Sequence, residues 1–279
     1  MRQLSLGYSP CPNDTFIFYG LIHGKVPCPE VKFIEQLEDV ETLNQLAMQS
    51  QLDLTKISYH AFGHLRKDYV LLHSGGALGR GCGPLIVARQ NTSMAKLRGK
   101  KIAIPGQLTT ANLLLQLHSE GYEDVLILPF DQIMTAVEDG KADAGVIIHE
   151  SRFTYQQHGL KEILDLGQWW EEETGYPIPL GGILAKRTLG TTLIKKIDTA
   201  LRLSIEYAYA YAHSQEPQNY IKQNAQELDD NVVRKHIDLY VNNFSVDLGD
   251  EGIQAVNSLL RRAEERGIIP ACELPLFAE

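Results

Sequence analysis

Short apolar runs with the spacing of β-strands alternate with amphipathic helix patterns along most of the chain. Strands are expected at Leu4–Tyr8, Val31–Ile34 and Leu52–Ile57, and a helix at Val40–Ser50 separates the second strand from the third. This alternation is typical of sheets in which helices connect parallel strands. The sequence therefore predicts an α/β fold with mostly parallel, doubly wound sheets.

A second unit of the same kind begins at residue 93, in "SMAKLRGKKIAIPGQLTTANLLLQL". Strands are expected at Lys101–Ile104, Val125–Leu128 and Ala144–Ile148, and a helix is expected to begin at Thr109 or Thr110. With 279 residues, the chain is near the size at which a single hydrophobic core stops growing. We therefore expect two lobes.

Two glycine-dense apolar segments, "SGGALGRGCGPLIVAR" and "PIPLGGILAKR", are expected to carry the chain between the lobes. Residues 1–90 and 188–279 would then form the first lobe, and residues 91–187 would form the second. From Thr191 onward only helical patterns remain in the sequence. These C-terminal helices are expected to pack back on the first lobe.

Composition and charge argue against several classes of partner. The chain has 26 basic and 35 acidic residues and a formal net charge of −9, without a basic run, so nucleic acid is not expected as a partner. No apolar run is long enough to span a bilayer, and the N-terminus lacks a signal-peptide pattern, so we expect a cytoplasmic protein without membrane insertion. The cysteines lie far apart and the histidines lack metal-ligand spacing, so no metal site is expected.

The stretch "SPCPNDTF" follows the first expected strand, where a helix should begin. Pro10 and Pro12 keep the chain extended until Asn13 or Asp14 can cap the helix. A strand end that meets the free N–H groups of a helix often holds an anion or a polar ligand, which makes Ser9, Asn13 and Asp14 candidate ligand-binding residues. A well-capped turn without a ligand is the alternative interpretation.

Two segments, "ETLNQLAMQSQLDLTKIS" and "QIMTAVEDGKADAGVIIHE", share one pattern of a helix, a break, an aspartate and a strand with polar residues at its end. Ligands of open α/β sheets bind beyond the carboxyl ends of the strands. Lys56 with Ser58, and His149, would lie at such ends in different lobes. Together with the "SPCPNDTF" turn and the turn at Thr109 and Thr110, four strand ends converge on one cleft. This is the architecture of a type II periplasmic-binding-protein fold, with two doubly wound lobes joined by two crossings.

These motifs together closely resemble the 1,4-dihydroxy-6-naphthoate synthase family of the futalosine pathway of menaquinone biosynthesis, and the resemblance covers essentially the whole chain. It implies a carbon–carbon lyase that needs no cofactor. Such an enzyme converts cyclic dehypoxanthinylfutalosine into 1,4-dihydroxy-6-naphthoate and releases a sugar-derived fragment. The resemblance also implies the following substrate-binding positions: Lys56, Ile57, Ser58, Thr109 and Thr110.

The reaction implied by the resemblance needs one base that works near neutral pH. His149 fits, because the ordinary pKa of histidine lies near the working pH. His149 also corresponds to the proton acceptor proposed for the family. The alternative interpretation is that His149 is a buried core residue whose hydrogen bonds have only a structural role.

Other candidate residues also have simpler interpretations. Thr109 is an N-cap in the alternative view, and Lys56 is a solvated charge or a partner of Asp53. A thiol near a helix N-terminus, such as Cys11, can act as a nucleophile. We expect Cys11 to be a small buried group instead, because the implied reaction needs no covalent intermediate.

Three functional classes share the predicted fold: the naphthoate-forming lyase, a non-catalytic solute-binding protein, and a chorismate dehydratase-type enzyme of the same pathway. The "SPCPNDTF" motif favours the lyase, although this choice depends on resemblance and not on fold physics. The expected partner is a small-molecule carboxylate substrate, and the expected state is a monomer or a homodimer.

Overall fold

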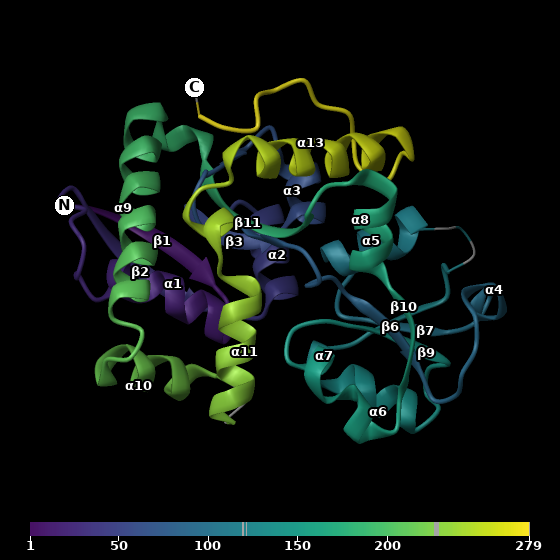
Figure 1. Ribbon diagram of the computed structural model, residues 1–279. Helices are drawn as coiled ribbons and strands as arrows, with labels where there is room; N and C mark the ends of the chain where they lie inside the picture. Colours follow the sequence, from purple (N-terminus) through teal and green to yellow (C-terminus); the bar gives the residue numbers. More distant parts are fainter. Residues whose placement is uncertain (119, 121, 226–228, 279) are drawn as a thin grey trace.

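The computed structural model describes residues 1–118, 120, 122–225 and 229–278. Figure 1 shows two lobes side by side, each built on a mixed sheet with helices against it. The N-terminal strands and the long C-terminal helices belong to one lobe, and the middle of the chain builds the other.

The strands of the first sheet are, in spatial order, β2 (Val31–Leu37), β1 (Arg2–Tyr8), β3 (Leu54–Ser58), β11 (Ile178–Lys186) and β4 (Tyr69–Leu71), with β5 (Ala77–Gly79) also paired to β11. β1 runs parallel to β2 and β3, whereas β11 runs antiparallel to β3, β4 and β5. β3 is buried along its whole length. Lys56 therefore sits in a strand position that would ordinarily be apolar.

The strands of the second sheet are, in spatial order, β10 (Lys161–Asp165), β6 (Leu85–Ala88), β9 (Ala144–Ile147), β7 (Ile102–Ile104) and β8 (Val125–Ile127). β7 runs parallel to β8 and β9, and β6 runs antiparallel to β9 and β10. After β9 the chain continues through Ile148 to His149, and both residues line the cavity that first-lobe residues also line.

The prediction of mostly parallel sheets was wrong, because both sheets are mixed. A parallel neighbour requires a crossover connection, usually a helix. β6 and β11 instead enter their sheets directly from the other lobe, so no crossover sets their direction. The strands β5 and β10 were not predicted, because β5 lies inside a glycine-dense segment and β10 is a partly exposed, charged segment without an apolar run.

Two strands, β6 and β11, pair in the sheet of the lobe opposite to the one that the expected boundaries give them. β6 precedes residue 91 but pairs in the second sheet, and β11 precedes residue 188 but pairs in the first sheet. We therefore propose that the chain crosses between the lobes within residues 80–84 and 175–177.

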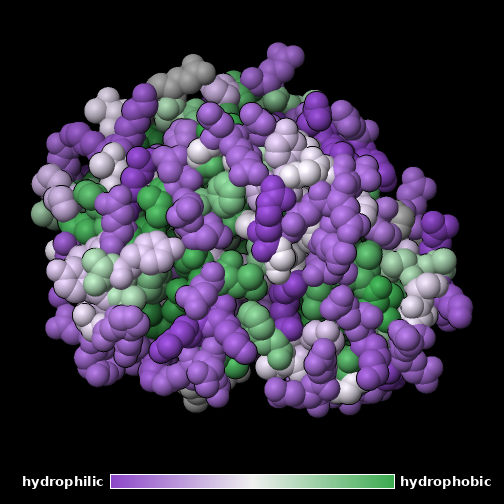
Figure 2. Space-filling model, in the orientation of Figure 1, coloured by the Kyte–Doolittle hydropathy of each residue, from purple (hydrophilic) through white to green (hydrophobic). Residues whose placement is uncertain are grey.

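The helices of the described residues are α1 (Pro12–Ile22), α2 (Val40–Met48), α3 (Tyr59–Leu65), α4 (Met94–Leu97), α5 (Thr110–His118), α6 (Ile133–Glu138), α7 (Ser151–Thr154), α8 (Leu166–Thr174), α9 (Thr191–Ala210), α10 (Gln215–Asn224), α11 (Asp230–Tyr240), α12 (Asn243–Val246) and α13 (Gly249–Glu265), with 3-10 turns at Phe130–Gln132, Tyr155–His158 and Arg187–Leu189. No helix among them is both long and apolar enough to span a membrane. Figure 2 shows small apolar areas separated by hydrophilic side chains on the face in view.

The C-terminal helices pack on α1, which confirms the prediction that they return to the first lobe (Figure 1). The contact between α1 and α9 includes a buried hydroxyl, Ser204. Its Oγ accepts from the N–H of Leu21 at 2.9 Å and donates to the carbonyl of Ile17 at 2.6 Å. A Cβ on Gly20 would lie 3.0 Å from the same Oγ, so a small residue lets the two helices approach.

One buried histidine joins the two lobes. Nδ1 of His60, on α3, donates to the backbone carbonyl of Thr109 at 3.2 Å, just before α5 begins. Burial lowers the pKa of His60 to about 4, because desolvation disfavours the charged imidazolium.

We expect this buried histidine to make the free energy of unfolding depend on pH. Between the ordinary pKa of 6.5 and the folded value of about 4, the unfolded chain takes up a proton that the folded chain does not. The folded state should therefore lose about 3 kcal/mol as the pH falls through this window, with no loss above it. Urea unfolding of the parent and of His60→Gln measures this term, since the variant should have a shallower pH dependence. Parallel pH curves for the two proteins would contradict it.

Candidate active site

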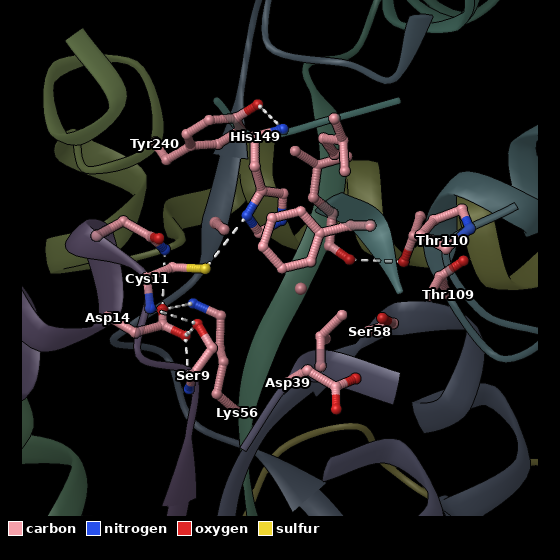
Figure 3. A pocket seen from close by; sticks show the side chains of 18 of the residues that line it. Ser9, Cys11, Asp14, Asp39, Lys56, Ser58, Thr109, Thr110, His149 and Tyr240 are labelled. Carbon is pink, nitrogen blue, oxygen red and sulfur yellow. Dashed lines mark hydrogen bonds and ion pairs between the residues drawn. The ribbon is translucent and has the colours of Figure 1, made fainter. Parts of the chain in front are cut away.

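A cavity of about 140 Å³ lies between the lobes. The first lobe contributes the ends of β1 and β3, and the second lobe contributes the start of α5 and the segment after β9 (Figure 3). The structure brings all the binding and catalytic candidates from the sequence to its wall: Ser9, Asn13, Asp14, Lys56, Ile57, Ser58, Thr109, Thr110 and His149.

The "SPCPNDTF" turn begins α1 earlier than predicted. Cys11 is the N-cap residue, with extended backbone and no side-chain cap bond, and Pro12 occupies the first helical position. Proline suits that position because its fixed φ is helical and its missing N–H is not needed. The expected cap at Asn13 or Asp14 was therefore wrong. The carboxylate of Asp14 instead accepts from the backbone N–H and the hydroxyl of Ser9, at 3.2 and 2.8 Å.

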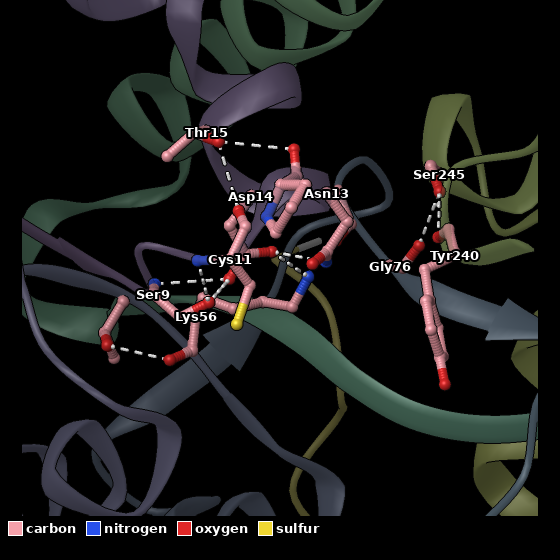
Figure 4. A network of polar contacts seen from close by, with 12 residues as sticks. Ser9, Cys11, Asn13, Asp14, Thr15, Lys56, Gly76, Tyr240 and Ser245 are labelled. Atoms are coloured by element: carbon pink, nitrogen blue, oxygen red, sulfur yellow. Dashed lines mark hydrogen bonds and ion pairs between the residues drawn. The ribbon is translucent and has the colours of Figure 1, made fainter. Parts of the chain in front are cut away.

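Asp14 also forms a buried ion pair with Lys56 (Figure 4). Nζ of Lys56 lies 3.0 Å from Oδ1 of Asp14, and the two side chains are only 8% and 3% exposed. The same Nζ donates to the carbonyl of Gly75 at 3.2 Å, and Nδ2 of Asn13 donates to Oδ1 of Asp14 at 2.8 Å. Lys56 therefore pairs with Asp14 and not with Asp53. An ammonium has three N–H donors, so one remains for a ligand in the cavity.

Ser58 and Ile57 form the wall at the end of β3. The N–H of Ser58 donates to Oδ1 of Asn44 at 3.0 Å, and its Oγ accepts from Nδ2 of the same side chain at 3.3 Å. Because Oγ is the acceptor in this bond, its own hydrogen can donate to a ligand. Ile57 is buried and adds apolar surface beside this donor.

Thr109 and Thr110 lie across the cavity from Asp14 and Lys56 (Figure 3). Oγ1 of Thr109 accepts from the N–H of Asn112 at 3.3 Å, so Thr109 does act as a cap. Both threonine hydroxyls donate to backbone carbonyls, that of Thr109 to Gly106 at 2.8 Å and that of Thr110 to Leu180 at 2.5 Å. What α5 can offer an anion is therefore chiefly the backbone N–H groups of its first turn.

His149 follows β9 in a left-handed backbone conformation, with φ of 62°. Such a conformation is strained for a residue other than glycine and needs support from its surroundings. The hydroxyl of Tyr240, on α11, accepts from the backbone N–H of His149 at 3.2 Å. Nδ1 of His149 lies 3.5 Å from Sγ of Cys11, and the ring of Phe130 stacks on the imidazole.

Desolvation in the cavity lowers the pKa of His149 below its ordinary value, while the carboxylates of Glu150 and Asp14 act in the opposite direction. The imidazole is therefore neutral near pH 7 and able to accept a proton. Burial raises the pKa of the Cys11 thiol, so the sulfur keeps its hydrogen and is a poor nucleophile. This agrees with the expectation that Cys11 is a small buried group.

Sequence reasoning missed Tyr240, Phe130 and Leu180, which also line the cavity. It also missed that Glu150 and His236 lie beside His149, where the three side chains offer possible metal-ligand atoms within 4.8 Å of one another. The only signal in the sequence was the spacing of His236 and Tyr240, which places both on one face of α11.

Comparison with known proteins identifies the family. The profile of a family described as menaquinone biosynthesis matches residues 4–265. A 1,4-dihydroxy-6-naphthoate synthase from Thermus thermophilus is 52% identical over 277 residues, which cover 99% of this chain and 100% of that protein.

Solved structures show the same fold. Protein AF1704 from Archaeoglobus fulgidus has a TM-score of 0.88 and 36% identity, with 96% of this chain and 98% of that chain covered. A Candida albicans protein described as having the generic periplasmic binding protein fold has a TM-score of 0.69 and 16% identity, with 98% and 92% covered. The predicted periplasmic-binding-protein-like fold is thereby confirmed. The chain belongs to the menaquinone biosynthesis family that includes 1,4-dihydroxy-6-naphthoate synthase, as its motifs predicted.

Proposed function

We propose that the chain is a carbon–carbon lyase that converts cyclic dehypoxanthinylfutalosine into 1,4-dihydroxy-6-naphthoate in the cavity between its lobes. The observation that carries this proposal is His149, a neutral imidazole held by two elements of the other lobe at the wall of that cavity. The 52% identity to a naphthoate synthase over almost the whole chain supports the choice of substrate.

The cavity offers matching groups for each part of such a substrate. The backbone N–H groups at the start of α5, with the partial positive charge of the helix end, suit the aryl carboxylate. Phe130, Ile57 and Leu180 give apolar surface for the ring system. Lys56 and Ser58 provide the donors for oxygen atoms of the ketone or of the sugar-derived portion.

In the proposed mechanism, His149 accepts a proton from the substrate. The proton comes from a hydroxyl of the sugar-derived portion, and the electron pair left on that oxygen forms a C=O bond as the carbon–carbon bond breaks. The electron pair of the broken bond passes into the ring system, where aromatisation favours the product. Lys56 and Ser58 donate to the oxygen on which negative charge develops. The side chains of the protein supply each of these steps, so we propose a reaction without a cofactor.

A cytoplasmic location and a monomeric or homodimeric state remain predictions. The cysteines Cys11, Cys28, Cys82 and Cys272 are free thiols, which fits a reducing compartment.

The anion site at α5 can be tested with a double substitution, Thr109→Val with Thr110→Val. It removes the cap and the bond to Leu180, so the first turn of α5 is no longer held toward the ligand. We expect about tenfold weaker binding of the naphthoate product by calorimetry, as for the loss of a charge-assisted hydrogen bond. Asn242→Ala removes a cap of similar worth outside the cavity and should leave this affinity unchanged. Equal affinities for parent and double variant would remove α5 from the site.

Substitution of the thiol separates packing from nucleophilic catalysis. Cys11→Ser keeps a small group whose oxygen can accept a hydrogen bond from Nδ1 of His149, so the lone pair of the other ring nitrogen stays free and most of the turnover should remain. Turnover is followed by the absorbance of the naphthoate product. Complete loss in a folded variant would instead assign the nucleophile to Cys11.

His149→Asn tests the base directly. Asparagine keeps one hydrogen bond but cannot accept a proton near neutral pH, so product affinity should stay near that of the parent. Turnover should fall by about two orders of magnitude or more, the typical contribution of a positioned general base. His158→Asn is the matched control, because His158 is a half-exposed histidine paired with Glu138 outside the cavity. If His149→Asn turned over at close to the parental rate, Asp14 would become the next candidate base.

A further inference from the structure

Three side chains that meet behind the cavity wall have no shared role in the proposed mechanism. His149 and Glu150 follow β9 in one lobe, and His236 lies on α11, which packs on the other. The proposed mechanism uses neither Glu150 nor His236. A histidine and a carboxylate buried together in this way require an explanation.

The hydrogen bonds around Asp14 determine which nitrogen of His236 carries the proton. The carboxylate of Asp14 can only accept, so the group of Asn13 that lies 2.8 Å from it is the donor, Nδ2 (Figure 4). Oδ1 of Asn13 therefore faces Nε2 of His236 at 2.8 Å and accepts its hydrogen. The proton of the neutral imidazole is on Nε2, and Nδ1 has a free lone pair.

That lone pair points at another acceptor. Oε1 of Glu150 lies 3.3 Å from Nδ1 of His236, whose side chain is 0% exposed. No hydrogen-bond donor of the described residues reaches Nδ1, or the second carboxylate oxygen of Glu150. A buried imidazole lone pair that faces a carboxylate oxygen, with no donor near it, is unfavourable unless a cation lies between the two atoms.

The geometry suits a metal ion. Zinc binds imidazole nitrogen and carboxylate oxygen at about 2.0–2.2 Å, and a tetrahedral arrangement then separates neighbouring ligand atoms by about 3.3–3.5 Å. Nδ1 of His236 and Oε1 of Glu150 lie 3.3 Å apart, within this range. Metal-binding histidines typically donate their other N–H to a carbonyl or carboxylate, as His236 does to Asn13. Two histidines and one glutamate are a ligand set of known zinc sites, whereas magnesium and calcium prefer oxygen ligands.

We propose that His149, Glu150 and His236 form a binding site for a first-row transition-metal cation such as Zn²⁺. His149 would need only a side-chain adjustment to join the other two, because the three ligand atoms already lie within 4.8 Å of one another. One consequence rests on the proposed function. An imidazole nitrogen bound to a metal cannot accept a proton from the substrate, so metal binding and turnover compete for His149, and the ion is an inhibitor.

Metal binding can be measured without substrate. The full-length protein, treated with a chelator and dialysed at pH 7.5, is titrated with Co²⁺ and then with Zn²⁺. We expect one Co²⁺ per chain with the visible absorption of a tetrahedral site, and its displacement by Zn²⁺. Glu150→Gln and His236→Gln should each weaken binding by at least about tenfold, since each removes one ligand. Circular dichroism and thermal unfolding show whether these variants remain folded.

Glu138→Gln is the matched control, because Glu138 pairs with His158 at 3.1 Å near the surface, outside the cavity. It should bind Co²⁺ as the parent does. Absence of the tetrahedral spectrum, or equal affinity in the parent, Glu150→Gln and His236→Gln, would overturn the proposed site and assign a shared proton to the pair instead.

An activity measurement separates this proposal from the proposed function. If the parent releases naphthoate, Zn²⁺ should inhibit it, and inhibition of Glu150→Gln should need at least about tenfold more Zn²⁺. A parent that binds one Zn²⁺ but yields no naphthoate would retain the metal site and remove the lyase. A parent that turns over without binding Co²⁺ or Zn²⁺ would retain the lyase and remove the metal site.

Discussion

The buried ion pair between Asp14 and Lys56 is the interaction on which the rest of the site depends. Desolvating two charges is unfavourable, and this pair is tolerable because nearly every oxygen and hydrogen has a partner: Ser9 and Asn13 donate to the carboxylate, and the carbonyl of Gly75 accepts from the ammonium. Removal of one partner from such a pair typically costs about 3–5 kcal/mol. The pair joins the turn after β1 to β3 and to the loop before β5. Because Asn13 bonds to both Asp14 and His236, the ion pair also fixes the tautomer of His236, which lies beside His149.

His149, the base that we propose, belongs to the other lobe, so the cavity depends on the interface between the lobes. His149 keeps a left-handed backbone conformation that its own segment would not favour, and its supports, Cys11 and Tyr240, come from elements of the first lobe. Further bonds cross between the lobes. The carboxylate of Glu41 on α2 accepts from the N–H of Leu108, and a Cβ at Gly106, where φ is 157°, would lie 2.5 Å from the same carboxylate. Contacts between the lobes therefore fix the position of His149 as well as forming the cavity.

Much of this arrangement follows from the sequence, because the residues that carry chemistry stand directly after apolar runs. Lys56 and Ser58 end one such run and His149 follows another, and these strand ends of the two sheets meet at the cavity between the lobes. The direction of β6 and β11 could not be predicted. A strand that is buried on both faces has a continuous apolar sequence whether it pairs parallel or antiparallel to its neighbours. The contacts of His236 also lay beyond prediction. Its partner Asn13 is 223 positions away, and only the packing of α11 on α1 brings them together.

The same fold can serve solute binding or catalysis, and the feature that separates the two functions in our proposal is the environment of the His149 imidazole. The donors at the start of α5 and at the end of β3 would serve a binding protein equally well. What a lyase adds is a nitrogen that keeps a free lone pair near neutral pH, and desolvation of His149 provides it by disfavouring the imidazolium. The same condition applies to His236, whose lone pair is held toward Glu150 by the bond to Asn13. A neutral imidazole in a water-poor space has a lone pair that can accept a proton or bind a metal ion. The proton transfer that we propose and the metal site that we propose therefore make the same demand on His149, a neutral ring nitrogen with a free lone pair.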